Sequence, residues 1–149
     1  MCHISYCEAV GSLLYLTITT CPDIAFPIRI LSQFVDNLGW VHLEGVKHVS
    51  RYLAGTMDWV LIYGIKVKGL EGFTDGDGAM QEHRHAIMGY AFLIHEGAVS
   101  WFSKKQEIDT LSTAKLEYVA ATHTAKEAIW LCRFIGEVFQ PLTNPIPLY

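Results

Sequence analysis

The stretch FTDGD, residues 73–77, marks the point at which the chain changes from helices to strands. A strand is predicted over residues 70–75, and its end overlaps this stretch. A β-rich run at residues 60–63 precedes the strand. Side chains two residues apart on a strand point to the same face, so Asp75 and Asp77 would share a face with their backbones about 7 Å apart. A strand that carries paired carboxylates therefore opens the second half of the chain.

The residues before this strand place apolar side chains at helical spacing. The pattern predicts helices over residues 5–19, from 23 to about 35, and over 40–54. Residues 1–57 are therefore expected to form a helical module.

The residues after the FTDGD strand return to a strand pattern and then to a long helical one. Residues 88–94 and 98–103 are rich in strand-forming side chains, and His95-Glu96-Gly97 supplies the turn of a hairpin. A long helix is predicted to open at Leu111-Ser112-Thr113, with Ser112 as its cap, and to run to about residue 138. Residues 58–149 thus predict an α/β domain of the α+β type, with antiparallel β-β-β followed by a long α-helix.

The last residues, 144–149, look like a loop that enters another strand. A strand without a following turn or partner is an unusual natural terminus. We therefore expect this second domain to be incomplete.

Composition restricts the class of protein only moderately. With 149 residues and 51% apolar content, the chain can bury a core and form one domain or a small domain with a helical appendage. The net charge of −4 argues against a strong nucleic-acid binder, which is usually basic. A nuclease that collects carboxylates around metal ions can still be acidic, so this class stays open.

The cysteines and the apolar runs point to an intracellular protein without a membrane partner. Cys2, Cys7, Cys21 and Cys132 show neither zinc-site spacing nor the density of a disulfide scaffold, so we expect reduced thiols. The apolar run at residues 9–18 is too short to span a bilayer.

The candidate chemistry lies in the carboxylates. Asp75, Asp77 and a helical Glu117 could bind Mg²⁺, which prefers oxygen ligands and can activate water for phosphodiester hydrolysis. The alternative is an acidic strand end near a turn and an exposed helical glutamate. Sequence spacing leaves both interpretations open.

Basic and imidazole side chains offer further candidates. Lys104 and Lys105 follow two aromatic residues and could contact the phosphates and sugars of a nucleic acid, or simply lie at a solvated strand end. His83 and His85 could bind a metal ion but have no third ligand nearby in the sequence, so an ordinary loop is the favoured interpretation.

Nine ordered blocks give the chain a resemblance to a known family. It resembles the C-terminal part of the Pol polyprotein of copia-type long-terminal-repeat retrotransposons, from the end of the reverse transcriptase into its ribonuclease H domain. The blocks are YCEAVGSLLYL (6–16), PDIAF (22–26), HLEGVKHVSRYLAGT (42–56), FTDGD (73–77), GYAF (89–92), SWFSKKQ (100–106), LST (111–113), EYVA (117–120) and AKEAIWL (125–131).

The resemblance implies a ribonuclease H fold that binds magnesium ions and cuts the RNA strand of an RNA/DNA hybrid. Asp75 matches its first carboxylate and Glu117 its second, whereas the family's third and fourth carboxylates follow a pair like Leu148-Tyr149. Members usually carry Trp at the position of Gly78 and an acidic residue at that of Lys115. We therefore expect a truncated and inactive hybrid-cleaving site.

Two alternatives to a truncated Pol fragment remain at this point. The chain could be a non-catalytic protein that binds nucleic acid or recruits more Pol polypeptide through an unpaired sheet edge. It could also fold poorly and have no function. The resemblance implies a parent protein that works in cytoplasmic particles, so the expected location is cytoplasmic.

Overall fold

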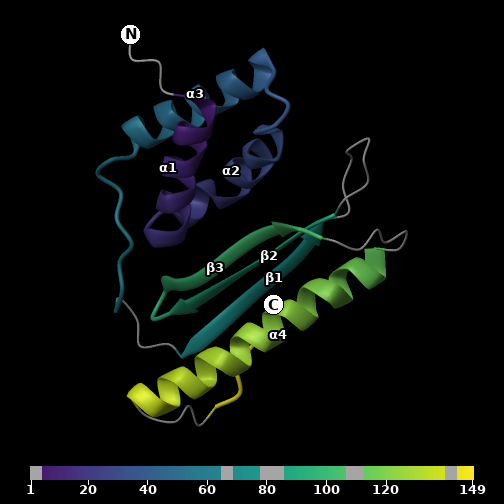
Figure 1. The fold of residues 1–149 in the computed structure, drawn as a ribbon. Coiled ribbons are helices and arrows are strands. Elements are labelled where there is room, and N and C mark those ends of the chain that lie inside the picture. Colours follow the sequence, from purple (N-terminus) through teal and green to yellow (C-terminus); the bar gives the residue numbers. More distant parts are fainter. Residues whose placement is uncertain (1–4, 65–68, 78–85, 107–112, 140–143) are drawn as a thin grey trace. The chain divides into compact units, whose positions relative to one another are not determined.

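The computed structural model describes residues 5–64, 69–77, 86–106, 113–139 and 144–149, and of Asp77 it describes the backbone (Figure 1). The chain divides into two compact units, Met1–Leu61 and Ile62–Tyr149. The predicted boundary lay slightly earlier, after residue 57. Each unit has its own core and is described by itself.

The first unit is helical, as predicted. It contains α1 (Tyr6–Thr19), α2 (Ala25–Leu31) and α3 (Trp40–Gly55). The predicted second helix, 23–35, is divided: 3₁₀ turns at Pro22–Ile24 and Ser32–Phe34 flank the α-helical part. Pro27 explains the division at its start, because it lacks the N–H that an α-helix would need to reach the carbonyl of Asp23.

Caps and a buried hydroxyl hold this unit together. At the start of α1, the Ser5 hydroxyl accepts a hydrogen bond from the Glu8 N–H, and the Glu8 carboxylate accepts one from the Ser5 N–H. The Tyr6 hydroxyl donates to the carbonyl of Leu31 at 2.8 Å, which joins α1 to α2 in the core. The core side chains are Tyr6, Val10, Leu13, Ile24, Ile28, Leu31, Val46 and Val49.

The second unit contains the predicted antiparallel meander. Strands β1 (Leu70–Asp77), β2 (Ile87–Ile94) and β3 (Gly97–Lys105) lie in the order β1-β2-β3. His95 and Glu96 form the β2-β3 turn with φ of 50° and 69°, the positive values that a tight type I′ hairpin requires. The predicted hairpin is confirmed.

The β-rich run at residues 60–63 is not a strand in the structure, which corrects its sequence interpretation. Its last residue instead docks on the hairpin. The Tyr63 hydroxyl donates to the carbonyl of Ala98 at 2.7 Å, and the Tyr63 ring occupies the space in which a side chain on Gly97 would lie. The aromatic residue that favoured a strand is therefore used as a tertiary contact.

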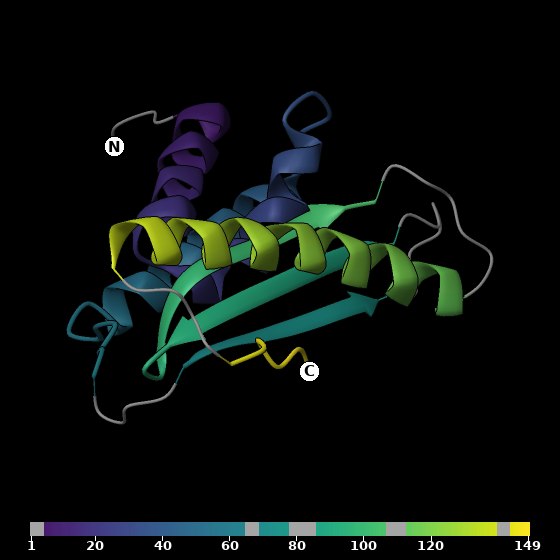
Figure 2. The same ribbon diagram turned by 90° about the horizontal axis from the view of Figure 1, so that it is seen from below.

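Helix α4 (Thr113–Val138) covers one face of the sheet and runs along β1 (Figure 2). Leu116 and Ala120 pack where a side chain on Gly76 would lie, and Thr124 donates to the hydroxyl of Thr74 at 2.7 Å. Farther along, Ala128 and Leu131 join the core cluster of Leu70 and Phe92. The helix is therefore antiparallel to β1, and its first turns lie at the carboxyl end of that strand.

The chain returns to the sheet after α4. Leu148 forms a parallel bridge with Gly72, supported by hydrogen bonds from Gly72 N to Pro147 O (3.0 Å), Thr74 N to Tyr149 O (2.9 Å) and Tyr149 N to Gly72 O (2.9 Å). The expected entry into another strand is thus present beside β1. No helix in the described ranges is both long enough and apolar enough to cross a membrane.

A polar contact ties α4 to the far strands of the sheet. The Ser100 hydroxyl on β3 donates to the Glu127 carboxylate on α4 at 2.7 Å. Burial raises the pKa of Tyr90 on β2, and the negative charge of Glu127 raises it further. Tyr90 therefore keeps its proton more tightly in the folded chain than in the unfolded one.

We predict that replacing Gly72 by Ala destabilises the second unit by about 1–3 kcal/mol. The added Cβ would lie 2.5 Å from Leu148 Cδ2 and 2.6 Å from Phe92 Cε1, and Phe92 is 0% exposed and cannot move aside. Amide hydrogen exchange of the β2 strand measures the change in this unit alone. Gly69→Ala is the control, because a Cβ there meets nothing within 4 Å; equal protection in both variants would contradict the packing.

We also predict a loss of stability at alkaline pH that depends on Tyr90. Its raised pKa stabilises the fold fully below the unfolded pKa of about 10, and this contribution disappears as the pH rises from that value to the folded pKa. In a Tyr90→Phe variant the alkaline fall in the free energy of unfolding should be shallower. Identical pH profiles for the two proteins would show that Tyr90 is not coupled to folding.

Candidate functional site

Asp75 lies near the carboxyl end of β1, on the face of the sheet that α4 does not cover. Strand alternation sets this position, because Thr74 and Gly76 both face α4 and Asp75 lies between them. Asp75 pairs with Gly89 on β2 and its side chain is exposed. The backbone of Asp77 continues β1, but its side chain lies outside the described part.

Glu117 lies in the second turn of α4 and is exposed. Its neighbour Leu116 packs against Gly76, so Glu117 comes to the same end of the sheet as Asp75. The two carboxylates nevertheless come from different layers, one from the helix and one from the uncovered face of the sheet.

The fit of these residues to magnesium ions can be tested on the side chains that are described. Among them, no three His, Cys, Asp or Glu residues are grouped closely enough to hold a metal ion. Asp75 and Glu117 therefore do not make a complete metal site with the other described residues, and the Mg²⁺ site stays a prediction.

Lys104 and Lys105 end β3, where they pair with Met88 and Ile87 of β2. Both are partly exposed. Alternation places Lys105 on the same face as Asp75 and Lys104 on the face of α4. Of these two lysines, Lys105 therefore lies on the uncovered face with the candidate carboxylate.

Gln106 is a residue that the sequence interpretation missed. It is 2% exposed, its backbone N–H donates to the Ala86 carbonyl at 2.7 Å, and its side-chain Nε2 donates to the Leu116 carbonyl at 3.3 Å. It thereby joins the ends of β2 and β3 to the helix turn that carries Glu117. Glutamine is usually exposed, so its place at the end of the SWFSKKQ block was the only signal.

His83, His85 and Gly78, as well as the helix-start residue Ser112, lie outside the described residues. Cys7, Cys21 and Cys132 are free thiols in the described part of the chain.

Comparison with known proteins reveals clear relatives. The chain is 45% identical to the retrovirus-related Pol polyprotein from transposon TNT 1-94 of Nicotiana tabacum over 93% of its length. It is 34% identical to the Pol polyprotein from transposon RE1 of Arabidopsis thaliana over 97% of its length. No family model matches the chain, and no solved structure matches it.

The share of each relative's length that the chain covers differs. The chain spans 10% of the length of the two Pol polyproteins. It is also 38% identical to the secreted RxLR effector protein 161 of Plasmopara viticola, over 88% of this chain and 94% of that protein. The chain therefore belongs to the sequence family that unites this segment of retrovirus-related transposon Pol polyproteins with the secreted RxLR effector protein 161.

Proposed function

We propose that the chain corresponds to the junction in a transposon Pol polyprotein between the end of a reverse transcriptase and a ribonuclease H-like domain. The helical unit would be the reverse transcriptase end. The β-β-β-α unit would be the first part of the ribonuclease H-like domain, with an RNA/DNA hybrid as its partner. Asp75 and Glu117 would be its first two carboxylates.

The observation that supports this proposal most strongly is the parallel pairing of Leu148 with Gly72. It places β1 between an antiparallel strand, β2, and a parallel segment that follows a helical crossover. In open α/β sheets, ligands bind beyond the carboxyl ends of the strands, at the point where the strand order reverses. Asp75 lies near that end of β1, and the start of α4 brings Glu117 to the same end.

We assign no hydrolytic step to these residues. A metal ion that cleaves a phosphodiester needs several converging oxygen ligands, and the described side chains group fewer than three potential ligands at any point. The proposed role of this chain by itself is therefore to bind a hybrid, with Lys105 as the basic side chain on the face of Asp75.

A second candidate function is that of a non-catalytic interaction protein. The relative from Plasmopara viticola has nearly the same extent as this chain and is named as a secreted effector rather than as a polyprotein. A chain of these two units can thus occur outside a Pol polyprotein. In that case the segment paired to β1 would offer an edge for a partner strand.

We predict that the purified chain binds a labelled RNA/DNA hybrid but does not cleave it when Mg²⁺ is added. The experiment compares the chain with an Asp75→Asn, Glu117→Gln double variant, which removes both carboxylate charges and controls for contaminating nuclease. Fluorescence anisotropy reports binding and gel electrophoresis reports cleavage. Lys105→Gln should weaken binding, whereas Lys47→Gln in the other unit should not.

The outcomes separate the candidate functions. Cleavage that disappears in the double variant would show that the chain is a nuclease by itself and overturn the non-catalytic assignment. A folded chain without affinity for the hybrid would favour the interaction protein.

A further inference from the structure

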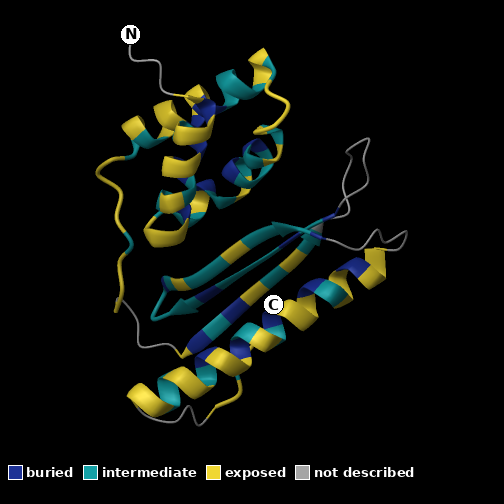
Figure 3. Ribbon diagram, viewed as in Figure 1, coloured by how far each residue is buried: buried dark blue, intermediate teal, exposed yellow. Residues whose placement is uncertain are grey.

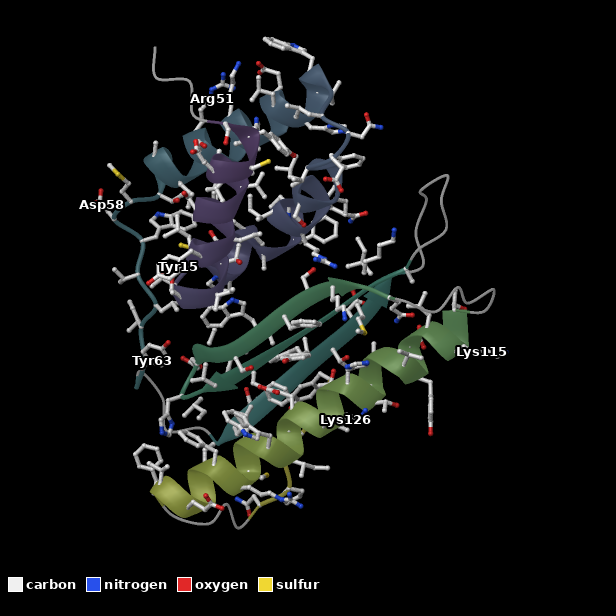
Figure 4. All side chains as sticks on the ribbon, in the orientation of Figure 1. Tyr15, Arg51, Asp58, Tyr63, Lys115 and Lys126 are labelled. Atoms are coloured by element: carbon white, nitrogen blue, oxygen red, sulfur yellow. The ribbon has the colours of Figure 1, made fainter. Side chains whose placement is uncertain are left out.

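The side of α4 that points away from the sheet carries a line of cations. Lys115, Lys126 and Arg133 follow one another at about three and then two helical turns, so they share one direction around the helix axis and span about 27 Å. All three are exposed. We call this line the α4 ridge; Lys115 and Lys126 are labelled in Figure 4.

The α4 ridge lies opposite the packed face of the helix. The buried residues of α4 are Leu116, Ala120, Thr124, Ala128 and Leu131, and the burial colours in Figure 3 show the alternation along the helix. Tyr118, Val119 and Thr122 lie between Lys115 and Lys126 on the outer side. The Thr122 hydroxyl is bonded to its own helix, to the carbonyl of Tyr118 at 2.8 Å.

Among the described residues, no salt bridge joins a ridge cation to an acidic side chain. The ion pair found within the described ranges, Lys47 with Glu44, belongs to the other unit. On α4, Glu127 is bonded to Ser100 of the sheet. Glu137 follows Arg133 by one turn, so Arg133 should contribute less than the two lysines.

Aromatic rings flank the ridge. Tyr118 is 76% exposed and Trp130 is 55% exposed, and they lie about 60° to either side of the line of cations. The Trp130 ring stacks on Phe134 with centroids 5.3 Å apart and an angle of 9° between the ring planes. This stack holds the indole in place and leaves more than half of its surface open.

We propose that the α4 ridge is a binding site for single-stranded nucleic acid. Regularly spaced cations would contact the phosphates, and the exposed rings of Tyr118 and Trp130 would stack on unpaired bases. A duplex does not offer free base faces to such rings. An anionic membrane is a poorer fit, because the cations run between the rings instead of bordering a continuous apolar face.

This site is separate from the proposed hybrid-binding site. Asp75 lies on the face of the sheet that α4 does not cover, so both the helix and the sheet lie between it and the ridge. A chain with both sites could hold a hybrid at one face and an unpaired strand at the other.

The test measures how the affinity of the full chain for a labelled oligothymidylate of about 20 nucleotides depends on salt. In the variant Lys115→Gln, Lys126→Gln, Arg133→Gln, the slope of log K against log salt should become shallower by about 1.4 to 2, because each phosphate contact in a single strand contributes about 0.7 and Arg133 contributes less than the lysines. Lys47→Gln is the control for an exposed lysine. Circular dichroism checks the fold, and glutamine keeps helix propensity at these positions.

The aromatic part of the proposal has its own readout. Trp130→Leu should weaken binding about tenfold with an unchanged salt slope, since stacking releases no counterions. Trp40→Leu, at an exposed tryptophan of the other unit, should leave the affinity unchanged.

Four results would overturn the ridge proposal. These are no binding of the single strand at low salt, an unchanged slope in the triple variant, equal affinity for a DNA duplex, or preferential binding to phosphatidylserine vesicles. An effect of Lys105→Gln but not of the triple variant would assign binding to the sheet, so the ridge would fail while the proposed function survived. A chain that binds the single strand but not the hybrid would contradict the proposed function and leave the ridge proposal standing.

Discussion

The close approach of α4 to β1 is the contact on which the second unit depends. Gly76 makes it possible, because a Cβ at this position would lie 2.5 Å from Leu116 Cδ2 and 3.3 Å from the Leu116 carbonyl oxygen. The hydrogen bond between Thr124 and Thr74 then fixes the helix along the strand. This packing sets the antiparallel direction of α4 and so determines that Glu117 arrives near the carboxyl end of β1.

The same helix also makes the parallel pairing of the last residues possible. A strand that runs parallel to β1 must be reached by a crossover, and α4 supplies it. Leu148 fills the space beside Gly72, and the ring of Tyr149 stacks on Phe73 with centroids 5.3 Å apart. β1 thereby acquires neighbours on both of its edges, β2 on one side and the segment at Leu148 on the other, and its acidic end lies where the parallel and antiparallel neighbours meet.

The helix has a different role on each of its sides. Its inner side packs on glycine and threonine of β1, its flank reaches Ser100 through Glu127, and its outer side carries cations and exposed rings. One element can therefore position a carboxylate at the sheet and present a basic surface elsewhere. The second unit is acidic in total, yet this distribution leaves room for a polyanion on one side of α4.

Periodicity in the sequence was sufficient to predict the elements: three helices, an antiparallel hairpin with its turn at residues 95–97, a further strand and a long helix. These features depend on local hydrophobic spacing and turn chemistry, which neighbouring residues carry. Tertiary structure alone decided that Lys105 and not Lys104 shares the uncovered face with Asp75, that Asp75 lies away from α4, that Gln106 is buried and that Tyr63 docks on the hairpin instead of extending a strand. The physical reason is that a strand pattern fixes which residues share a face, whereas the identity of the element that covers that face is set by contacts between residues far apart in the chain.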